Sequence, residues 1–249
     1  MCGIVAAAAR REVSEILLEG LRRLEYRGYD SAGMALVDNE HNLQMHKKQG
    51  KVAELERAQQ LDPFFGCTGI AHTRWATHGE PSAANAHPHI SGERVALVHN
   101  GIIENHAALR EELKAEGYQF NSGTDTEVVV HLLHRQLLAG ETLFAALRSA
   151  VEKLEGAYAI AAVDIEHPDE IVAAREGSPL VVGVGIGENF LASDQMALRQ
   201  VTDRFIYLEE GDMVRITPSS LQVYDREGNA VERKKTRIDE AVETVDMGD

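Results

Sequence analysis

The chain has 249 residues, 44% of them hydrophobic and 26% charged, and a formal net charge of −15 at pH 7. This length is ample for one large domain or two small ones with a buried core, and the acidic balance argues against nucleic acid or an anionic membrane surface as a partner. With two cysteines, no apolar run of membrane-spanning length and no secretory signal at the N-terminus, we expect a cytoplasmic protein without a disulfide framework.

The predicted elements of the first half mix strands with helices. A short buried strand is predicted for Gly3–Ala9, and apolar residues recur at helical spacing from Val13 to Leu24. The sequence then predicts a hairpin over 32–37 and 43–47, a helix over Val52–Leu61, strands over 68–76 and 95–99, and a helix over 105–116. Cys67 is most simply a structural thiol in a strand.

The second half begins with helices and continues with strands. The longest helix is predicted to start at Thr124, where Thr124 and Glu127 have the spacing of a capping box. A further helix is predicted over 143–154, followed by strands over 158–165, 170–174, 180–184, 190–192, 205–208, 213–216 and 221–224.

No linker is evident before residue 239. Residues 239–249 hold five acids and no base, which is typical of a solvated linker or tail. We therefore expect one α+β domain over 1–238, with two sheets stacked face to face and helices outside.

Cys2 is the first candidate catalytic residue. Removal of Met1 would give it a thiol and a free α-amino group, which titrates at about 7.7–8.0 and can therefore take the thiol proton. The thiolate of cysteine is the reactive form. Taken alone, the tripeptide favours the alternative, an ordinary second residue.

Two segments combine side chains suited to binding and catalysis. The loop His72-Thr-Arg-Trp-Ala-Thr-His-Gly79 holds Arg74, whose rigid fork suits a carboxylate; the alternative is a surface arginine stacked on Trp75. Asn100-Gly101 is a strong hairpin signal, but the sequence after it becomes helical. An Asn amide beside a Gly N–H can also supply the two donors of an oxyanion hole.

Three further features bear on a possible site: Asp125, the histidines and the glycines at 183–187. Asp125 can complement the dipole of the predicted helix or receive a substrate ammonium group. The histidines of His87-Pro-His89 and their neighbours lack a fixed ligand spacing, so they do not predict a metal site. The glycines at 183–187 precede a strand and not a helix, which argues against a dinucleotide loop.

Five motifs follow one another along the chain: Met1-Cys-Gly-Ile4, Glu25-Tyr-Arg-Gly-Tyr-Asp-Ser-Ala-Gly33, His72-Thr-Arg-Trp-Ala-Thr-His-Gly79, His99-Asn-Gly-Ile-Ile-Glu-Asn105 and Thr124-Asp-Thr-Glu127. They occur in this order in class II glutamine amidotransferases, which are N-terminal nucleophile hydrolases, and the chain resembles this family from Cys2 to about Arg237. Together they outweigh the ordinary interpretation of Cys2.

The resemblance implies a four-layer α/β/β/α sandwich of two antiparallel sheets and hydrolysis of L-glutamine to L-glutamate and ammonia. It implies Cys2 as the nucleophile with its own amine as the base. The Asn100 side chain and the Gly101 N–H would form the oxyanion hole. No cofactor and no metal are implied.

The resemblance also implies a substrate pocket. Arg74 would hold the α-carboxylate of glutamine and Asp125 its α-ammonium group, while Arg27 would support the nucleophile. The closing loop would contribute three lining residues, Trp75, Thr77 and His78.

The loop motifs are most similar to the branch whose full-length members make amino sugars. Those members carry a downstream isomerase domain that binds a sugar phosphate and accepts the ammonia, whereas this chain stops at Asp249. Two alternatives stay open: the glutaminase half of another class II enzyme, such as the phosphoribosyl-pyrophosphate amidotransferase, and a catalytically silent glutamine-sensing module.

Overall fold

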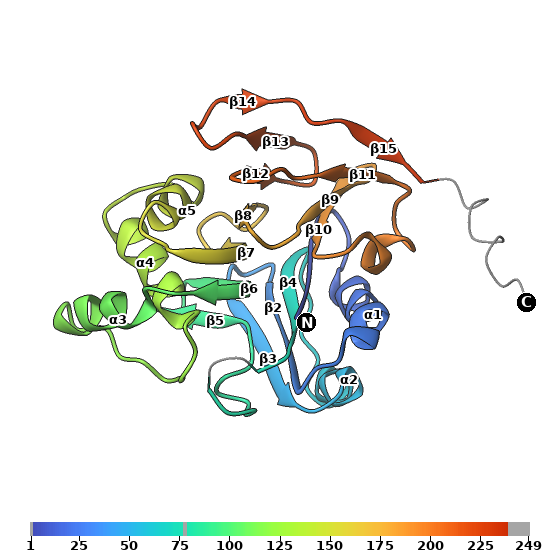
Figure 1. Ribbon diagram of the computed structural model, residues 1–249. Coiled ribbons are helices and arrows are strands. Elements are labelled where there is room, and N and C mark those ends of the chain that lie inside the picture. Colours follow the sequence, from blue (N-terminus) through green and yellow to red (C-terminus); the bar gives the residue numbers. More distant parts are fainter. Residues whose placement is uncertain (1, 77–78, 239–249) are drawn as a thin grey trace, which may run out of the picture.

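Two antiparallel sheets form the centre of the computed structural model, which describes residues 2–76 and 79–238 (Figure 1). The first sheet has the order β15 (Lys235–Arg237), β11 (Arg204–Tyr207), β9 (Val181–Val184), β10 (Glu188–Ala192), β1 (Gly3–Ala9), β4 (Thr68–Arg74), β2 (Ser31–Val37) and β3 (Leu43–Gln49). The second has the order β14 (Ala230–Val231), β13 (Leu221–Tyr224), β12 (Met213–Ile216), β8 (Ile171–Glu176), β7 (Gly156–Asp164), β6 (Val95–Ile103) and β5 (His89–Ser91).

Helices cover the outer face of each sheet, on opposite sides of the molecule (Figure 1). The first sheet is covered by α1 (Ser14–Leu24) and α2 (Val52–Leu61), and the second by α3 (His106–Ala115), α4 (Glu127–Leu138) and α5 (Leu143–Val151). Two short 3-10 helices, η1 (Glu25–Arg27) and η2 (Gln195–Leu198), complete the described elements. The predicted α+β class and four-layer sandwich are therefore confirmed.

The alternation of side chains along the strands explains the layers. In β1, Ile4 and Ala6 pack in the core between the sheets, whereas Val5 and Ala7 pack against the helices. Because successive side chains of a strand point to opposite faces, a continuously apolar strand can serve two cores at once. This explains why β1 is fully buried along its length.

Several sequence predictions differ from the structure, and three of the differences bear on the site. The strand predicted over 95–99 continues as β6 through Asn100 and Gly101, so these residues form no hairpin turn. The strand β5 lies between the strands predicted over 68–76 and 95–99, where the sequence predicts no helix or strand. The capping box is wrong because α4 starts at Glu127, whose carboxylate accepts hydrogen bonds from the backbone N–H groups of Asn121 and Ser122, both 2.8 Å.

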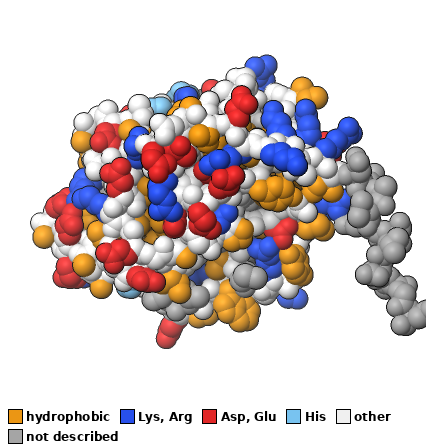
Figure 2. Space-filling model, turned by 45° about the horizontal axis from the view of Figure 1, so that its top comes forward, with side chains coloured by type: hydrophobic (Ala, Val, Ile, Leu, Met, Phe, Trp, Pro, Cys, Tyr) orange, Lys and Arg blue, Asp and Glu red, His pale blue; other side chains and the backbone are white. Residues whose placement is uncertain are grey.

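The surface mixes charges of both signs. On the face shown in Figure 2, acidic and basic side chains are interspersed over much of the area. Among the described residues, no helix has the length and apolarity needed to span a membrane. The predicted acidic tail at 239–249 lies outside the described residues.

Candidate active site

Strand register brings Cys2 and Arg74 together. Gly3 of β1 pairs with Thr73 of β4 in an antiparallel ladder, so the next positions outward are Cys2 and Arg74. Ile4 packs in the core between the sheets, and a period of two places Cys2 on that same face. The two candidates therefore sit at one end of the layer between the sheets.

The Cys2 thiol is partly buried and held by the backbone that follows β4. Its sulfur accepts a hydrogen bond from the Trp75 N–H at 3.3 Å, and it lies 3.6 Å from the Trp75 carbonyl oxygen. Burial raises the pKa of the Cys2 thiol above its ordinary value, while the Trp75 N–H and the positive charge of Arg74 oppose that rise. A base is therefore needed to generate the thiolate.

Asn100 and Gly101 belong to the second sheet and lie beside Cys2. The Asn100 Nδ2 donates to the carbonyl oxygen of Cys2 at 3.2 Å. Gly101 has a φ of +119°, and a Cβ there would lie 2.1 Å from the Ala157 carbonyl oxygen, so a larger residue would clash. The segment thus brings an amide donor and a glycine backbone beside Cys2.

Asp125 is buried in the loop before α4 and is bound to the second sheet. Its Oδ2 accepts a hydrogen bond from the Ile103 N–H at 2.7 Å. This contact with the end of β6 is a tertiary one, which neither a helix cap nor a dipole effect accounts for. It places the carboxylate at the same cavity as Cys2 and Gly101.

Arg74 is buried, and its guanidinium holds the segment that follows. It donates to the carbonyl oxygen of Gly79 at 3.1 Å and lies 3.9 Å from an oxygen of Asp30. Asp30 also accepts a hydrogen bond from the Ala76 N–H. The sequence interpretation assigned no role to Asp30, although it belongs to one of the five motifs.

The other predicted pocket residues have different positions. Trp75 is 53% exposed, and the edge of its ring lies against Gly28. Arg27 forms an ion pair with Asp194, and its role in supporting the nucleophile stays a prediction. Thr77 and His78 lie outside the described residues.

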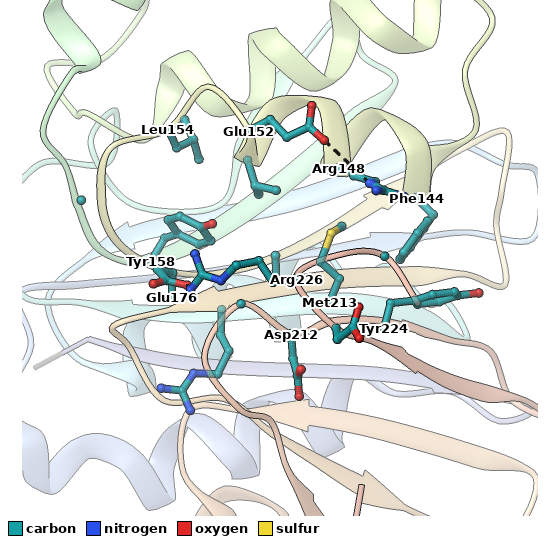
Figure 3. Close-up of a pocket in the computed structure, with 17 residues that line it drawn as sticks. Phe144, Arg148, Glu152, Leu154, Tyr158, Glu176, Asp212, Met213, Tyr224 and Arg226 are labelled. Atoms are coloured by element: carbon teal, nitrogen blue, oxygen red, sulfur yellow. Dashed lines mark hydrogen bonds and ion pairs between the residues drawn. The ribbon is translucent and has the colours of Figure 1, made fainter. Parts of the chain in front are cut away.

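These groups surround one small cavity. Its lining residues are Cys2, Arg74, Trp75, His87, His99, Gly101, Asp125 and Thr126. A larger cavity lies between α5 and the second sheet, lined by residues such as Tyr158, Met213 and Arg226 (Figure 3). The two cavities share no lining residue, and Cys2 lines only the smaller one.

Buried histidines next to Cys2 are the part of the site that sequence reasoning missed. Burial lowers the pKa of His72 to about 3, and it also lowers the pKa values of His87, His89 and His99. These histidines are therefore neutral near pH 7. The sequence carries a signal, because several histidines cluster in and beside the motifs, but their spacing alone does not show that they are buried side by side.

Comparison with known proteins identifies the family. The family model described as "Glutamine amidotransferase domain" matches residues 72–200. The chain belongs to the glutamine amidotransferase family.

Similar full-length proteins include two bacterial enzymes. The chain is 59% identical over 249 residues to the glutamine–fructose-6-phosphate aminotransferase (isomerizing) of Pseudomonas aeruginosa, covering 100% of this chain and 41% of that protein. It is 59% identical over 234 residues to the Escherichia coli K12 protein of the same name, covering 94% of this chain and 38% of that protein. The chain thus spans about two fifths of the length of these relatives.

A solved structure shares the fold. The glutamine phosphoribosylpyrophosphate amidotransferase of B. subtilis superposes with a TM-score of 0.78 at 28% sequence identity, covering 92% of this chain and 50% of that chain. The predicted class II amidotransferase family and the N-terminal nucleophile hydrolase fold are thereby confirmed, whereas the roles of the individual site residues are proposals.

Proposed function

We propose that the domain hydrolyses L-glutamine to L-glutamate and ammonia, as the glutaminase part of a glutamine–fructose-6-phosphate aminotransferase. The observation that carries the proposal is the cavity where Cys2, Arg74, Gly101 and Asp125 meet, with Asn100 beside it. It combines a nucleophile, oxyanion donors and one charge of each sign. L-glutamine fits these groups, because it has a side-chain amide for the nucleophile and an α-ammonium and an α-carboxylate group for the two charges.

The reaction starts at the Cys2 thiol once Met1 is removed. The neutral α-amine takes the thiol proton, and the sulfur attacks the side-chain amide carbon of glutamine. The resulting oxyanion accepts hydrogen bonds from the Asn100 Nδ2 and the Gly101 N–H. Collapse breaks the carbon–nitrogen bond, the α-ammonium group returns its proton to the leaving nitrogen, and ammonia departs. Water then hydrolyses the thioester to glutamate.

Arg74 and Asp125 hold the two charged groups of the substrate. The guanidinium suits the α-carboxylate, because it carries five N–H donors and its Nη2 group donates to the Gly79 carbonyl oxygen. Asp125 uses Oδ2 for the Ile103 N–H, and Oδ1 is the oxygen that we assign to the α-ammonium group. Trp75, Thr77 and His78 complete the pocket in this proposal.

The fate of the ammonia depends on a part outside this chain. By analogy with the relatives at 59% identity, a downstream isomerase domain receives it and converts fructose 6-phosphate to glucosamine 6-phosphate. The identity to the phosphoribosylpyrophosphate enzyme is only 28%, which favours the amino-sugar branch over that alternative. Alone, this domain releases ammonia into water.

The decisive experiment combines a glutaminase assay with an intact mass. The active protein has lost Met1, and a variant with one uncleavable residue before Cys2 is inactive, because an amide nitrogen cannot accept the thiol proton. Full activity in the extended variant would contradict the mechanism. A correctly processed protein without glutaminase activity would instead support the glutamine-sensing alternative.

A further inference from the structure

His72 connects the two sheets at the candidate active site. It lies in β4 with its side chain fully buried, on the same face as Ile70, which packs in the core between the sheets. In β6, Asn100 shares the face of Val98, which packs in that core from the other side. The imidazole of one sheet therefore meets the amide of the other.

The contacts of His72 determine which ring nitrogen carries the proton. Nε2 lies 3.0 Å from the carbonyl oxygen of His99 and 2.9 Å from the Asn100 Oδ1. A backbone carbonyl can only accept, so Nε2 must be protonated and must donate. The opposite placement of the Asn100 amide would bring its NH₂ group against this N–H, and two donors would face each other.

The same hydrogen bond directs the other end of the amide. With Oδ1 bound to His72, Nδ2 points to Cys2 and donates to its carbonyl oxygen at 3.2 Å. A chain of donors thus runs from His72 through Asn100 to the backbone of the nucleophile. The orientation that an oxyanion donor needs is therefore set from outside the substrate pocket.

The surroundings keep this ring neutral and in one tautomer. The His87 ring stacks on it with centroids 4.2 Å apart and an interplanar angle of 14°. Burial lowers the pKa of His72 to about 3, so protonation is unfavourable near pH 7. Nδ1 has no hydrogen-bond partner among the described residues, which favours a bare lone pair there over a buried N–H.

We propose that His72, as its neutral Nε2–H tautomer, is a positioning residue that holds the Asn100 amide with its NH₂ group toward the oxyanion. The inference rests on the proposed glutaminase function and deepens it. His72 touches no reacting atom and acts only through Asn100. Its removal can therefore cost at most what the Asn100 donor contributes.

The test compares His72→Phe with His72→Gln. Phenylalanine fills the space without a donor, and we expect kcat to fall by about tenfold to 10²-fold with little change in KM, since one oxyanion donor contributes on the order of 10²–10³ in kcat. Glutamine places an N–H at similar reach and should restore most of the loss. Equal losses in both variants would overturn the proposal.

A double-mutant cycle separates positioning from general damage. If His72 acts through Asn100, His72→Phe adds almost nothing to the loss in Asn100→Ala. Multiplied losses would show an independent role and overturn the proposal. His134→Phe, which replaces a histidine on α4 outside the cavity lining, is the matched control and should keep wild-type kcat.

Nitrogen-15 NMR of the imidazole keeps the proposal testable even if His72→Phe fails to fold. The wild-type spectrum should show His72 protonated at Nε2 and unprotonated at Nδ1. An Nδ1–H tautomer or an imidazolium near pH 7 would overturn the assignment. Failure of the proposed function is distinguishable, because wild-type protein without Met1 would then lack glutaminase activity altogether.

Discussion

The layer between the two sheets contains two unlike regions. Most of it is an apolar region of small and branched side chains, including Ala6, Val98, Ala161 and Ile171. One end is polar, and we define this polar end as Cys2, His72, Arg74 and Asn100. The boundary falls within single strands: β4 passes from Ile70 to His72, and β6 passes from Val98 to Asn100.

The two regions are stable for different reasons. In the apolar region, burial contributes roughly 25 cal/mol per Å² of apolar surface, whatever the direction of each side chain. At the polar end, a buried donor or acceptor left without a partner costs about 1–3 kcal/mol, so the direction of each group matters. Substitutions at the polar end should therefore change activity as well as stability, and those in the apolar region should change stability alone.

The largest expected effect at the polar end comes from Cys2→Ala. Without the sulfur no thioester forms, so we expect turnover to be lost while Arg74 and Asp125 still hold the substrate. Calorimetry should show glutamine affinity within roughly tenfold, or about 1.4 kcal/mol, of the wild type. Wild-type turnover in this variant would remove Cys2 from its proposed role.

Asn100→Ala should have the next largest effect. Its amide is proposed to bind the oxyanion and not the ground-state carbonyl, so kcat should fall by about 10²–10³ while KM changes little. Steady-state kinetics on glutamine provide the measurement. A change confined to KM would instead make Asn100 a residue that binds the substrate in its ground state.

Asp125→Asn tests the charge at the cavity. Asparagine keeps an oxygen for the Ile103 N–H but removes the charge that faces the substrate ammonium group. Breaking a buried pair costs about 3–5 kcal/mol, and the lower end of that range corresponds to a loss of about 10² in kcat/KM.

A matched substrate serves as the control for Asp125→Asn. The loss should be much smaller for a glutamine analogue whose α-amine is acylated. Equal losses on the two substrates would show that Asp125 serves only the structure.

The buried histidines predict acid sensitivity. Their pKa values in the folded state are lowered by burial, to about 3 for His72, whereas an unfolded histidine titrates near 6.5. The unfolded state then binds more protons than the folded state as the pH falls, so the contribution of the neutral histidines to the free energy of unfolding is complete above about pH 6.5 and is lost progressively below it, down to about pH 3 for His72.

Urea unfolding at pH 7.5 and at pH 5.5 measures this loss. Each such histidine adds up to about 1.4 kcal/mol per pH unit to the slope of the unfolding free energy against pH, which corresponds to one proton. Because burial also lowers the pKa of His89, replacing His89 with Phe should reduce this slope by about that amount. A free energy of unfolding that does not change between the two pH values would show that the histidines take up protons in the folded state as readily as in the unfolded state.

Ile171→Val in the apolar region should have the smallest effect. The residue is fully buried in β8, and removing one methylene group there costs about 0.5–1.5 kcal/mol of stability. We expect kcat and KM to stay within about twofold of the wild type, because such a substitution acts only through packing. A large loss of kcat without a loss of stability would contradict the division into two regions.

The sequence by itself determined the elements and the chemical candidates. The strand Gly3–Ala9 follows from a continuous apolar run, and helices such as Val52–Leu61 follow from periodic apolar positions; both are local properties of the chain. Cys2 was a candidate because its chemistry needs only its own thiol and amine. The class II amidotransferase motifs likewise predicted the family, which the comparisons confirmed.

Only the tertiary structure decided which groups meet. The Asn100-Gly101 signal for a hairpin was overridden because β6 pairs with β7 through both residues, and a capping box at Thr124 was excluded because Glu127 binds the preceding loop. The partner of His72 lies 28 residues away, and that of Asn100 lies 98 residues away. Such pairs depend on strand register and on the stacking of two sheets, which no local periodicity specifies.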